Sequence, residues 1–220
     1  MTSPELFQML LADARLPVAG HTQSAQLEPA VTDGLLSDDV PEFMALRLRT
    51  VARVEAGTAV VALHHLRQGM PLGDVELAWA ARTPSAAMRK TSRTMAKALR
   101  RLLCRLWPDH PGLASIEGRD SSRAVVLAVA ADACRLSPLA LARVIGYDDV
   151  QTVASAALKL MPLDPADVVS WVVDSLPAVD ALAAEAAPLT RPEDIPASGA
   201  PQIEAWAEAH ALTTRRLFSA

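Results

Sequence analysis

Apolar side chains recur at helical spacing through almost the whole of this 220-residue chain. They return about every three to four positions, and we find no stretch of alternating apolar and polar residues bounded by hairpin turns. Such a pattern leaves no segment suited to a sheet. We therefore predict an all-α fold, built as a single helical bundle-like domain.

The composition indicates how these helices pack. Hydrophobic residues make up 51% of the chain, while aromatic residues make up only 4%. Much of the apolar content is alanine, leucine and valine, which favours helices that approach each other closely through small side chains. The length is sufficient for one domain with a substantial buried core.

The helix boundaries follow from capping residues. Ser137-Pro138 and Asp164-Pro165 each place a side-chain acceptor at the N-cap and a proline at the first helical position. Gly34, Gly69 and Gly146 supply left-handed residues where helices are expected to end. The predicted helices span residues 4–14, 24–32, 39–68, 74–81, 85–107, 122–135, 138–145, 148–160 and 165–187.

The longest of these, 39–68, is predicted to be a central helix surrounded by the others. Gly57 lies inside it, where glycine costs about 1 kcal/mol relative to alanine. The helix is therefore expected either to bend at Gly57 or to pack very closely there.

Closely spaced prolines divide the chain near residue 188. They remove backbone donors and prevent a helix from running in from the preceding segment. We predict a helical body over 1–187, a proline-rich tether over 188–201 and a C-terminal amphipathic tail over 202–220.

The tail is predicted to be a helix with one apolar face. Arg215 and Arg216 would occupy its last turn, where cations suit the helix dipole. An apolar face that also carries Phe218 must either fold back on the body or bind another protein, because leaving it in water would promote aggregation. The residues at helical spacing are Ile203, Trp206, His210 and Leu217.

Charge and hydropathy exclude several partners for the chain as a whole. The net charge of -4 argues against nucleic acid or an anionic membrane surface, since either would demand a cationic footprint. No stretch approaches the roughly 20 apolar residues that span a bilayer, and the first residues do not resemble a secretory signal. We expect a cytoplasmic protein in which Cys104 and Cys134 are buried thiols rather than a disulfide or metal site.

One segment, 85–107, contains cations without a balancing carboxylate. Arg89, Arg93 and Lys97 repeat at a spacing that stacks like charges along one helix surface. Three interpretations stay open: a solvated face neutralised by carboxylates elsewhere in the fold, a docking surface for an acidic protein, or a nucleic-acid surface. The last is disfavoured because the face has no aromatic residue on which a base could stack.

No arrangement of residues indicates catalysis, a cofactor or a metal. His64 and His65 are adjacent, so they point about 100° apart on a helix and cannot share a metal. Nucleotide-binding glycine loops and nucleophile elbows are absent from the sequence. Aspartates at 148, 149, 164 and 167 are interpreted as residues of turns and helix starts. A helical enzyme with an interhelical cleft and a helical transcription regulator using 85–107 remain as alternatives.

Four blocks, in order along the chain, resemble the UreF-type urease accessory proteins, in a divergent, actinobacterial-like form. They are LPVAGHTQSAQLE (16–28), RKTSRTMA (89–96), AALKLMPL (156–163) and HALTTRRLFS (210–219). The family-motif residues in the first three blocks are Leu16, Pro17, Gly20, Thr22, Ser24, Leu27, Glu28, Arg89, Ser92, Met95 and Pro162.

The chain also departs from the family pattern. His21 stands where an aromatic residue is usual, Gln26 and Ala96 replace glycines, and Asp164-Pro165 replaces a common Gly-Gln pair. The leucine, proline, serine and Leu-Glu framework persists.

The resemblance implies an all-helical, non-catalytic protein that forms a homodimer and binds the accessory protein UreD, also called UreH, partly through its tail. It further implies recruitment of the GTPase UreG and association with apo-urease for nickel insertion. We expect the tail to become ordered on docking. The residues expected to bind the partner are Trp206, His210, Arg216, Leu217, Phe218 and Ser219.

Overall fold

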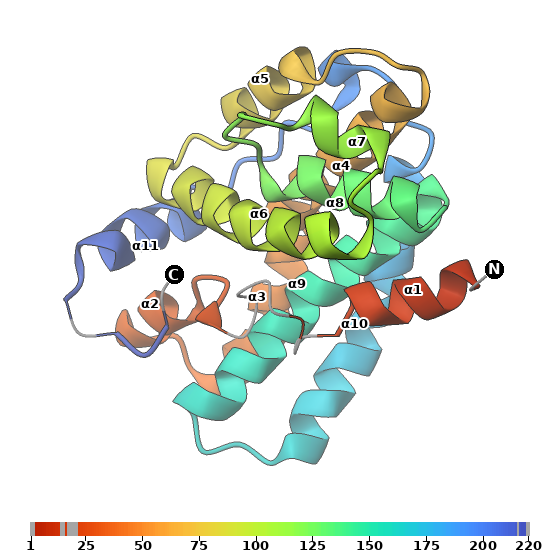
Figure 1. Ribbon diagram of the computed structural model, residues 1–220. Helices are drawn as coiled ribbons and strands as arrows, with labels where there is room; N and C mark the ends of the chain where they lie inside the picture. Colours follow the sequence, from red (N-terminus) through yellow and green to blue (C-terminus); the bar gives the residue numbers. More distant parts are fainter. Residues whose placement is uncertain (1–2, 14–15, 17–21, 215, 219–220) are drawn as a thin grey trace.

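The computed structural model describes residues 3–13, 16, 22–214 and 216–218. Within these ranges it contains helices and connecting segments and no strand, so the predicted all-α class is confirmed (Figure 1). No helix among the described residues is both long and apolar enough to cross a membrane.

The chain forms helices of very different lengths. They are α1 (Pro4–Leu11), α2 (Leu27–Thr32), α3 (Val40–Arg49), α4 (Val51–Arg67), α5 (Gly73–Arg82), α6 (Ala86–Leu106), α7 (Pro111–Ser115), α8 (Arg123–Ala133), α9 (Pro138–Leu160), α10 (Pro165–Ala186) and α11 (Pro201–Leu212), with short 3₁₀ turns η2 (Ser37–Asp39) and η3 (Pro192–Asp194).

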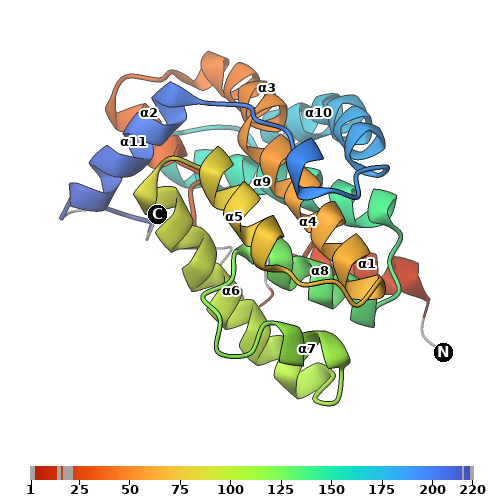
Figure 2. The same ribbon diagram turned by 90° about the horizontal axis from the view of Figure 1, so that it is seen from above.

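The core lies around α4, which contacts α5, α8, α9 and α10 (Figure 2). Both α4 and α8 consist largely of small apolar residues, and nearly every residue of α8 is buried. Small side chains let several helices approach one axis, which is the packing that the composition predicts. The long α9 and α10 pack against each other at one side of this core.

The predicted single helix over 39–68 is wrong. The helix is interrupted at Thr50, whose φ of -123° and ψ of -90° lie outside the helical region. As a result α3 and α4 are separate helices, and α4 alone is central. The Thr50 hydroxyl donates to the Leu46 carbonyl at 2.7 Å, which satisfies one acceptor at the end of α3. Helical periodicity continues across this break, which is why the sequence does not reveal it.

Gly57 does not interrupt α4, and the close-packing alternative is the correct one. A Cβ atom placed there would lie 2.7 Å from Cδ of Pro196. The segment predicted as a tether thus lies directly on the central helix. It is fixed further by Arg82 of α5, whose Nε donates to the Ile195 carbonyl at 2.6 Å, while the Ile195 side chain is buried.

Gly146 does not end a helix, contrary to prediction, because α9 continues through it. A Cβ atom there would lie 3.0 Å from Cγ1 of Val179 on α10, so the glycine permits a close helix crossing. Gly34 and Gly69 do adopt left-handed conformations, with φ of 105° and 66°. The hydroxyl of Ser137 caps α9, as predicted.

Asp164 caps α10 as predicted, accepting a hydrogen bond from the Ala166 backbone at 2.8 Å. Asp167 lies in the first turn of that helix, also as predicted. Both cysteines are free thiols. Cys134 is buried, and burial raises the pKa of its thiol to about 11, whereas Cys104 is exposed, contrary to prediction.

Candidate functional site

The tail helix α11 packs on the body, against α2 and α6, at the left of Figure 1. Ile203 is fully buried and His210 is only 5% exposed, while the Trp206 side chain is half-buried. Of the two outcomes considered for the apolar face, the structure therefore contains the first, in which the face folds back on its own chain.

The helix is shorter than predicted. It ends at Leu212, and Thr213 is extended with ψ of 130°, so Arg216 and Leu217 do not lie in a last helical turn. Leu217 is 64% exposed, whereas Phe218 is buried. Arg215 and Ser219 lie outside the described residues.

A single carboxylate, that of Glu28, holds the end of the tail. It lies in the first turn of α2, and its Oε2 is 3.1 Å from Nε2 of His210. The backbone N–H groups of Leu217 and Phe218 donate to Glu28 Oε1 and Oε2 at 2.5 and 2.9 Å. Hydrogen bonds to a charged acceptor are the stronger ones, so Glu28 joins the Leu-Glu pair of the first block to the RLF segment of the last. We call these contacts the Glu28 clasp.

Two aromatic side chains extend this contact. The Trp206 indole N–H donates to Asp33 Oδ2 at 2.8 Å, and its ring packs against Phe43 at 6.0 Å between centroids. The Phe218 ring lies 5.1 Å from Nζ of Lys159, in a cation–π contact. Lys159 belongs to the 156–163 block, and Pro162 follows it at an exposed position. Three of the four blocks, although distant in sequence, thus meet at one place.

The backbone of the first block explains one departure from the family pattern. Gln26 has φ of 63° and its neighbour Ala25 has φ of 50°, both in the left-handed region. Glycine adopts that region without the steric cost that a Cβ atom brings, which accounts for a glycine at the position of Gln26 in the pattern.

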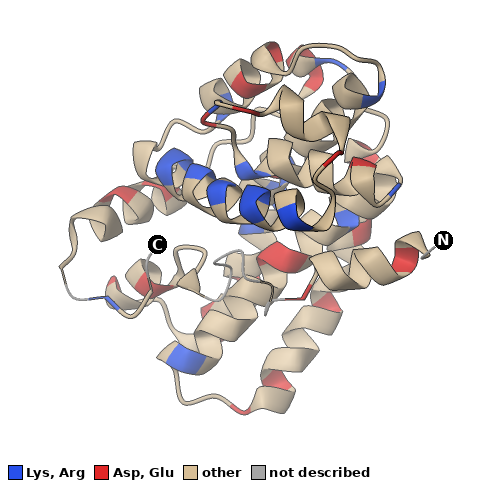
Figure 3. Cartoon of the chain, in the orientation of Figure 1, with Lys and Arg blue, Asp and Glu red and all other residues tan. Residues whose placement is uncertain are grey.

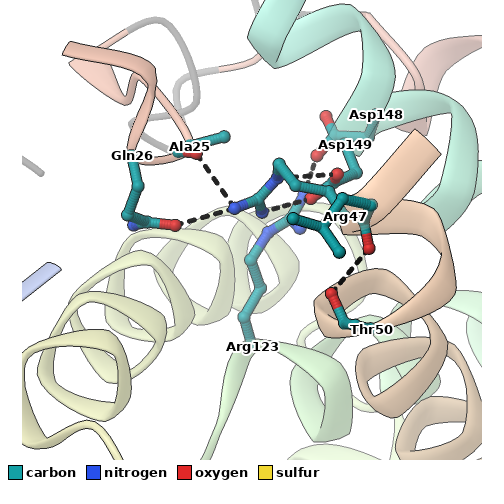
Figure 4. A network of polar contacts seen from close by, with 8 residues as sticks. Ala25, Gln26, Arg47, Thr50, Arg123, Asp148 and Asp149 are labelled. Carbon is teal, nitrogen blue, oxygen red and sulfur yellow. Dashed lines mark hydrogen bonds and ion pairs between the residues drawn. The ribbon is translucent and has the colours of Figure 1, made fainter. Parts of the chain in front are cut away.

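A buried arginine compensates for this conformation (Figure 4). Nη1 of Arg47 donates to the Ala25 carbonyl at 2.9 Å and to Gln26 Oε1 at 2.8 Å. Its Nε and Nη2 bind both oxygens of Asp149, at 2.9 and 2.6 Å. The bidentate pair fixes the guanidinium, which in turn fixes the two strained residues before α2.

The prediction that Asp148 and Asp149 lie at a turn or a helix start is wrong. Because α9 is continuous, they lie in its middle and face two arginines, with Asp148 Oδ2 accepting from Nη2 of Arg123 at 2.9 Å. The nearby Glu55 carboxyl accepts from the Trp79 indole N–H at 2.7 Å. These groups border a cavity of about 100 Å³, and burial raises the pKa of Glu55.

The remaining motif residues have structural contacts. Arg89 donates to the carbonyls of Thr83 and Pro84, and Ser92 Oγ accepts from the backbone N–H of Arg123 at 2.9 Å. Met95 borders the same cavity as Glu55.

In the first block, Leu16, Ser24 and Leu27 are buried and Thr22 is half-buried. Pro17, Gly20 and His21 lie outside the described residues. No group of His, Cys, Asp and Glu suited to a metal ion occurs among the residues that the structure describes.

Sequence reasoning named Glu28 and the tail residues but not their contact, because a pairing across more than 180 positions leaves no local signal. It also missed Arg47, Glu55 and Arg123. A charged residue inside an apolar helical stretch, such as Glu55, is the one clue that could have indicated a buried polar cluster.

Comparison with known proteins gives concordant results. The UreF family model matches residues 37–176. A urease accessory protein UreF from Mycobacterium sp. (strain JLS) is 33% identical over 213 residues, covering 96% of each chain. One from Mycolicibacterium vanbaalenii is 34% identical over 220 residues, again covering 96% of each. One from Mycobacterium tuberculosis (strain CDC 1551 / Oshkosh) is 32% identical over 170 residues, covering 73% of this chain and 74% of the relative.

Proposed function

The chain belongs to the UreF family, and from this premise we propose that it is a non-catalytic urease accessory protein acting in the cytoplasm. In this role it binds UreD/UreH through the tail, forms a homodimer and recruits the GTPase UreG. The resulting assembly associates with apo-urease and supports insertion of nickel, which is cargo of the assembly rather than a cofactor of this chain.

The observation that carries the proposal is the Glu28 clasp. It joins the first family block to the last, beside Lys159 of the third, and leaves part of the tail uncovered, with Leu212 85% exposed and Leu217 64% exposed. An apolar side chain held outward on a fixed backbone is a suitable anchor for a partner. We assign partner contact to Arg216 and Leu217, and positioning of the tail to Trp206, His210 and Phe218.

The expectation that the whole tail becomes ordered on docking has to be revised. Helix α11 is already folded against α2 and α6 in the chain alone. Docking therefore does not have to fold α11, and its entropy cost is smaller than for a free tail.

Removal of 209–220 tests the role of the tail. We expect the shortened chain to keep its helical circular dichroism and to lose co-purification with UreD, because both the clasp and the exposed anchor are absent. Retention of UreD by the shortened chain would contradict the proposal.

Arg216→Ala is the matched point variant. Among the described residues, Arg216 makes one hydrogen bond, of 3.4 Å from Nη1 to the His210 carbonyl, so the variant should weaken UreD binding while thermal unfolding stays nearly unchanged. A large drop in melting temperature would instead assign Arg216 to the stability of the body.

The homodimer requires an apolar surface, and α1 and α10 provide one. Leu6 and Met9 of α1 and Val169 and Val173 of α10 are more than half exposed. Met9 also borders a groove of about 560 Å³ between α1, α9 and α10. Burial of such a patch is a common basis of self-association.

Sedimentation at micromolar concentration should give a dimer that Val173→Glu dissociates and that Leu77→Glu, at an exposed position on α5, does not. A monomeric wild type would contradict the dimer.

A further inference from the structure

Helix α6 carries seven cations and no carboxylate. In Figure 3 the blue segments recur along α6 without a red one between them. Lys90, Lys97, Arg101 and Arg105 are exposed and Arg100 is half-buried, so most of the charge faces outward. This row lies on a chain whose net charge is -4.

Carboxylates elsewhere in the chain neutralise only part of this positive charge. Asp120 pairs with Arg93 at 3.4 Å and with Lys97 at 3.2 Å, and Arg89 is bound to backbone carbonyls. Within the described ranges, no carboxylate lies at ion-pair distance from the other cations of α6, which are Lys90, Arg100, Arg101 and Arg105. Neutralisation by carboxylates elsewhere in the fold therefore applies to Arg93 and Lys97 and not to the whole face.

The positive charges of α6 that have no carboxylate partner repel each other and destabilise the helix. Lys97, Arg101 and Arg105 follow each other at i, i+4 spacing, and each such like-charge pair destabilises a helix. An acidic surface placed against this row would convert the repulsion into attraction. Charge complementarity of this kind also raises the rate of association.

The same face ends in a hollow of about 160 Å³ between α6, α11 and the first block. Lys90 and Arg216 border it, together with the hydroxyl-bearing Thr91 and Thr94. The hollow also includes the amide side chains of Gln23 and Gln26, and no Phe, Tyr or Trp is among the described residues that line it. Two cations with hydroxyl and amide groups around a space of side-chain size fit a carboxylate.

We propose that the α6 face and this hollow form a docking surface for an acidic segment of a protein partner. One carboxylate of the segment occupies the hollow beside Lys90, and further acidic residues lie along Arg101 and Arg105. A protein segment fits better than nucleic acid, because neither the face nor the hollow offers an aromatic ring for base stacking. The surface shares Arg216 with the tail, but its other cations lie on α6 and the test below addresses those alone.

Binding of a fluorescein-labelled decaglutamate peptide to the full-length chain tests the proposal by fluorescence anisotropy. Lys90→Glu and Arg101→Glu should each weaken binding by about three- to tenfold, because each reversal replaces an attraction with a repulsion. Arg49→Glu is the matched control, since it makes the same change of net charge at an exposed position on α3, and it should stay within about twofold of wild type. Circular dichroism of each variant verifies that the fold is kept.

Three results would overturn the proposal. The first is an absence of saturable binding at low salt. The second is an equal loss of affinity in the α3 control, which would indicate attraction to net charge alone. The third is tighter binding of a decathymidylate oligonucleotide than of the peptide, which would assign the face to nucleic acid. None of these results bears on UreD binding by the tail.

Discussion

The core around α4 and the tail site are stabilised in different ways. In the core, Ala59, Val61 and Leu63 are fully buried against neighbouring helices, and the contacts are apolar and closely packed. At the tail site, the last residues are held by one carboxylate and one aromatic side chain, while Leu217 beside them stays exposed. Packing determines whether the body folds and also holds α11, whereas a few directional bonds determine where the residues after α11 lie. The tail can therefore be altered without unfolding the body.

The largest expected effect lies in the core. Leu63→Ala removes a fully buried side chain from α4 and should lower the free energy of unfolding by about 2–5 kcal/mol. Urea denaturation followed by circular dichroism measures it, with Leu77→Ala at an exposed position as the control. If Leu63→Ala lowered the free energy of unfolding by less than a tail variant does, the core would not be the main source of stability.

A tail variant should have a smaller and more local effect. Phe218→Ala removes a buried ring at the chain end, and we expect a loss of less than about 1 kcal/mol in global unfolding. Amide hydrogen exchange should instead accelerate in α11 and not in α4. Uniform acceleration across both helices would mean that tail and core unfold as one unit.

Glu55 offers a test by pH. Burial raises the pKa of this carboxyl, so the folded chain resists its ionisation. Protonated Glu55 therefore contributes to the free energy of unfolding at pH values below the usual glutamate pKa. This contribution is lost as the pH rises through the raised pKa. Glu55→Gln keeps an acceptor for the Trp79 indole, so it should be the more stable protein above neutral pH and converge with wild type in acid. A difference independent of pH would contradict this account.

The smallest expected effect concerns the left-handed residue before α2. Gln26→Gly and Gln26→Ala both lose the hydrogen bond from Arg47, but only alanine keeps the steric cost of a φ of 63°. The glycine variant should be the more stable of the two by about 1 kcal/mol in urea denaturation. Equal stabilities would show that Ala25 and Arg47 alone set this conformation.

Local chemistry made part of the fold predictable. The caps at Ser137 and Asp164 each follow from a residue and its immediate neighbours. At Gly57 the sequence leaves a bend or a close contact open, and packing against Pro196 decides between them. The break at Thr50 and the continuity of α9 through Gly146 do not, because tertiary packing decides between a helix end and a close helix contact.

The site was predictable in its members but not in its geometry. The family resemblance identified Glu28 and Phe218, yet nothing in the sequence places one beside the other. The pairing of Arg47 with Asp149 spans 102 positions and was missed for the same reason. Buried ion pairs depend on which helices become neighbours, and helical periodicity specifies only which face of each helix is buried.

The affinity of the chain for its UreD partner, measured by calorimetric titration with wild type and Glu28→Ala, tests the central claim most directly. Loss of the Glu28 clasp should weaken binding by about tenfold or more, because two charge-assisted hydrogen bonds to the tail backbone disappear, while the urea midpoint of the body changes little. Unchanged affinity in a chain that has lost the Glu28 carboxylate would contradict the account.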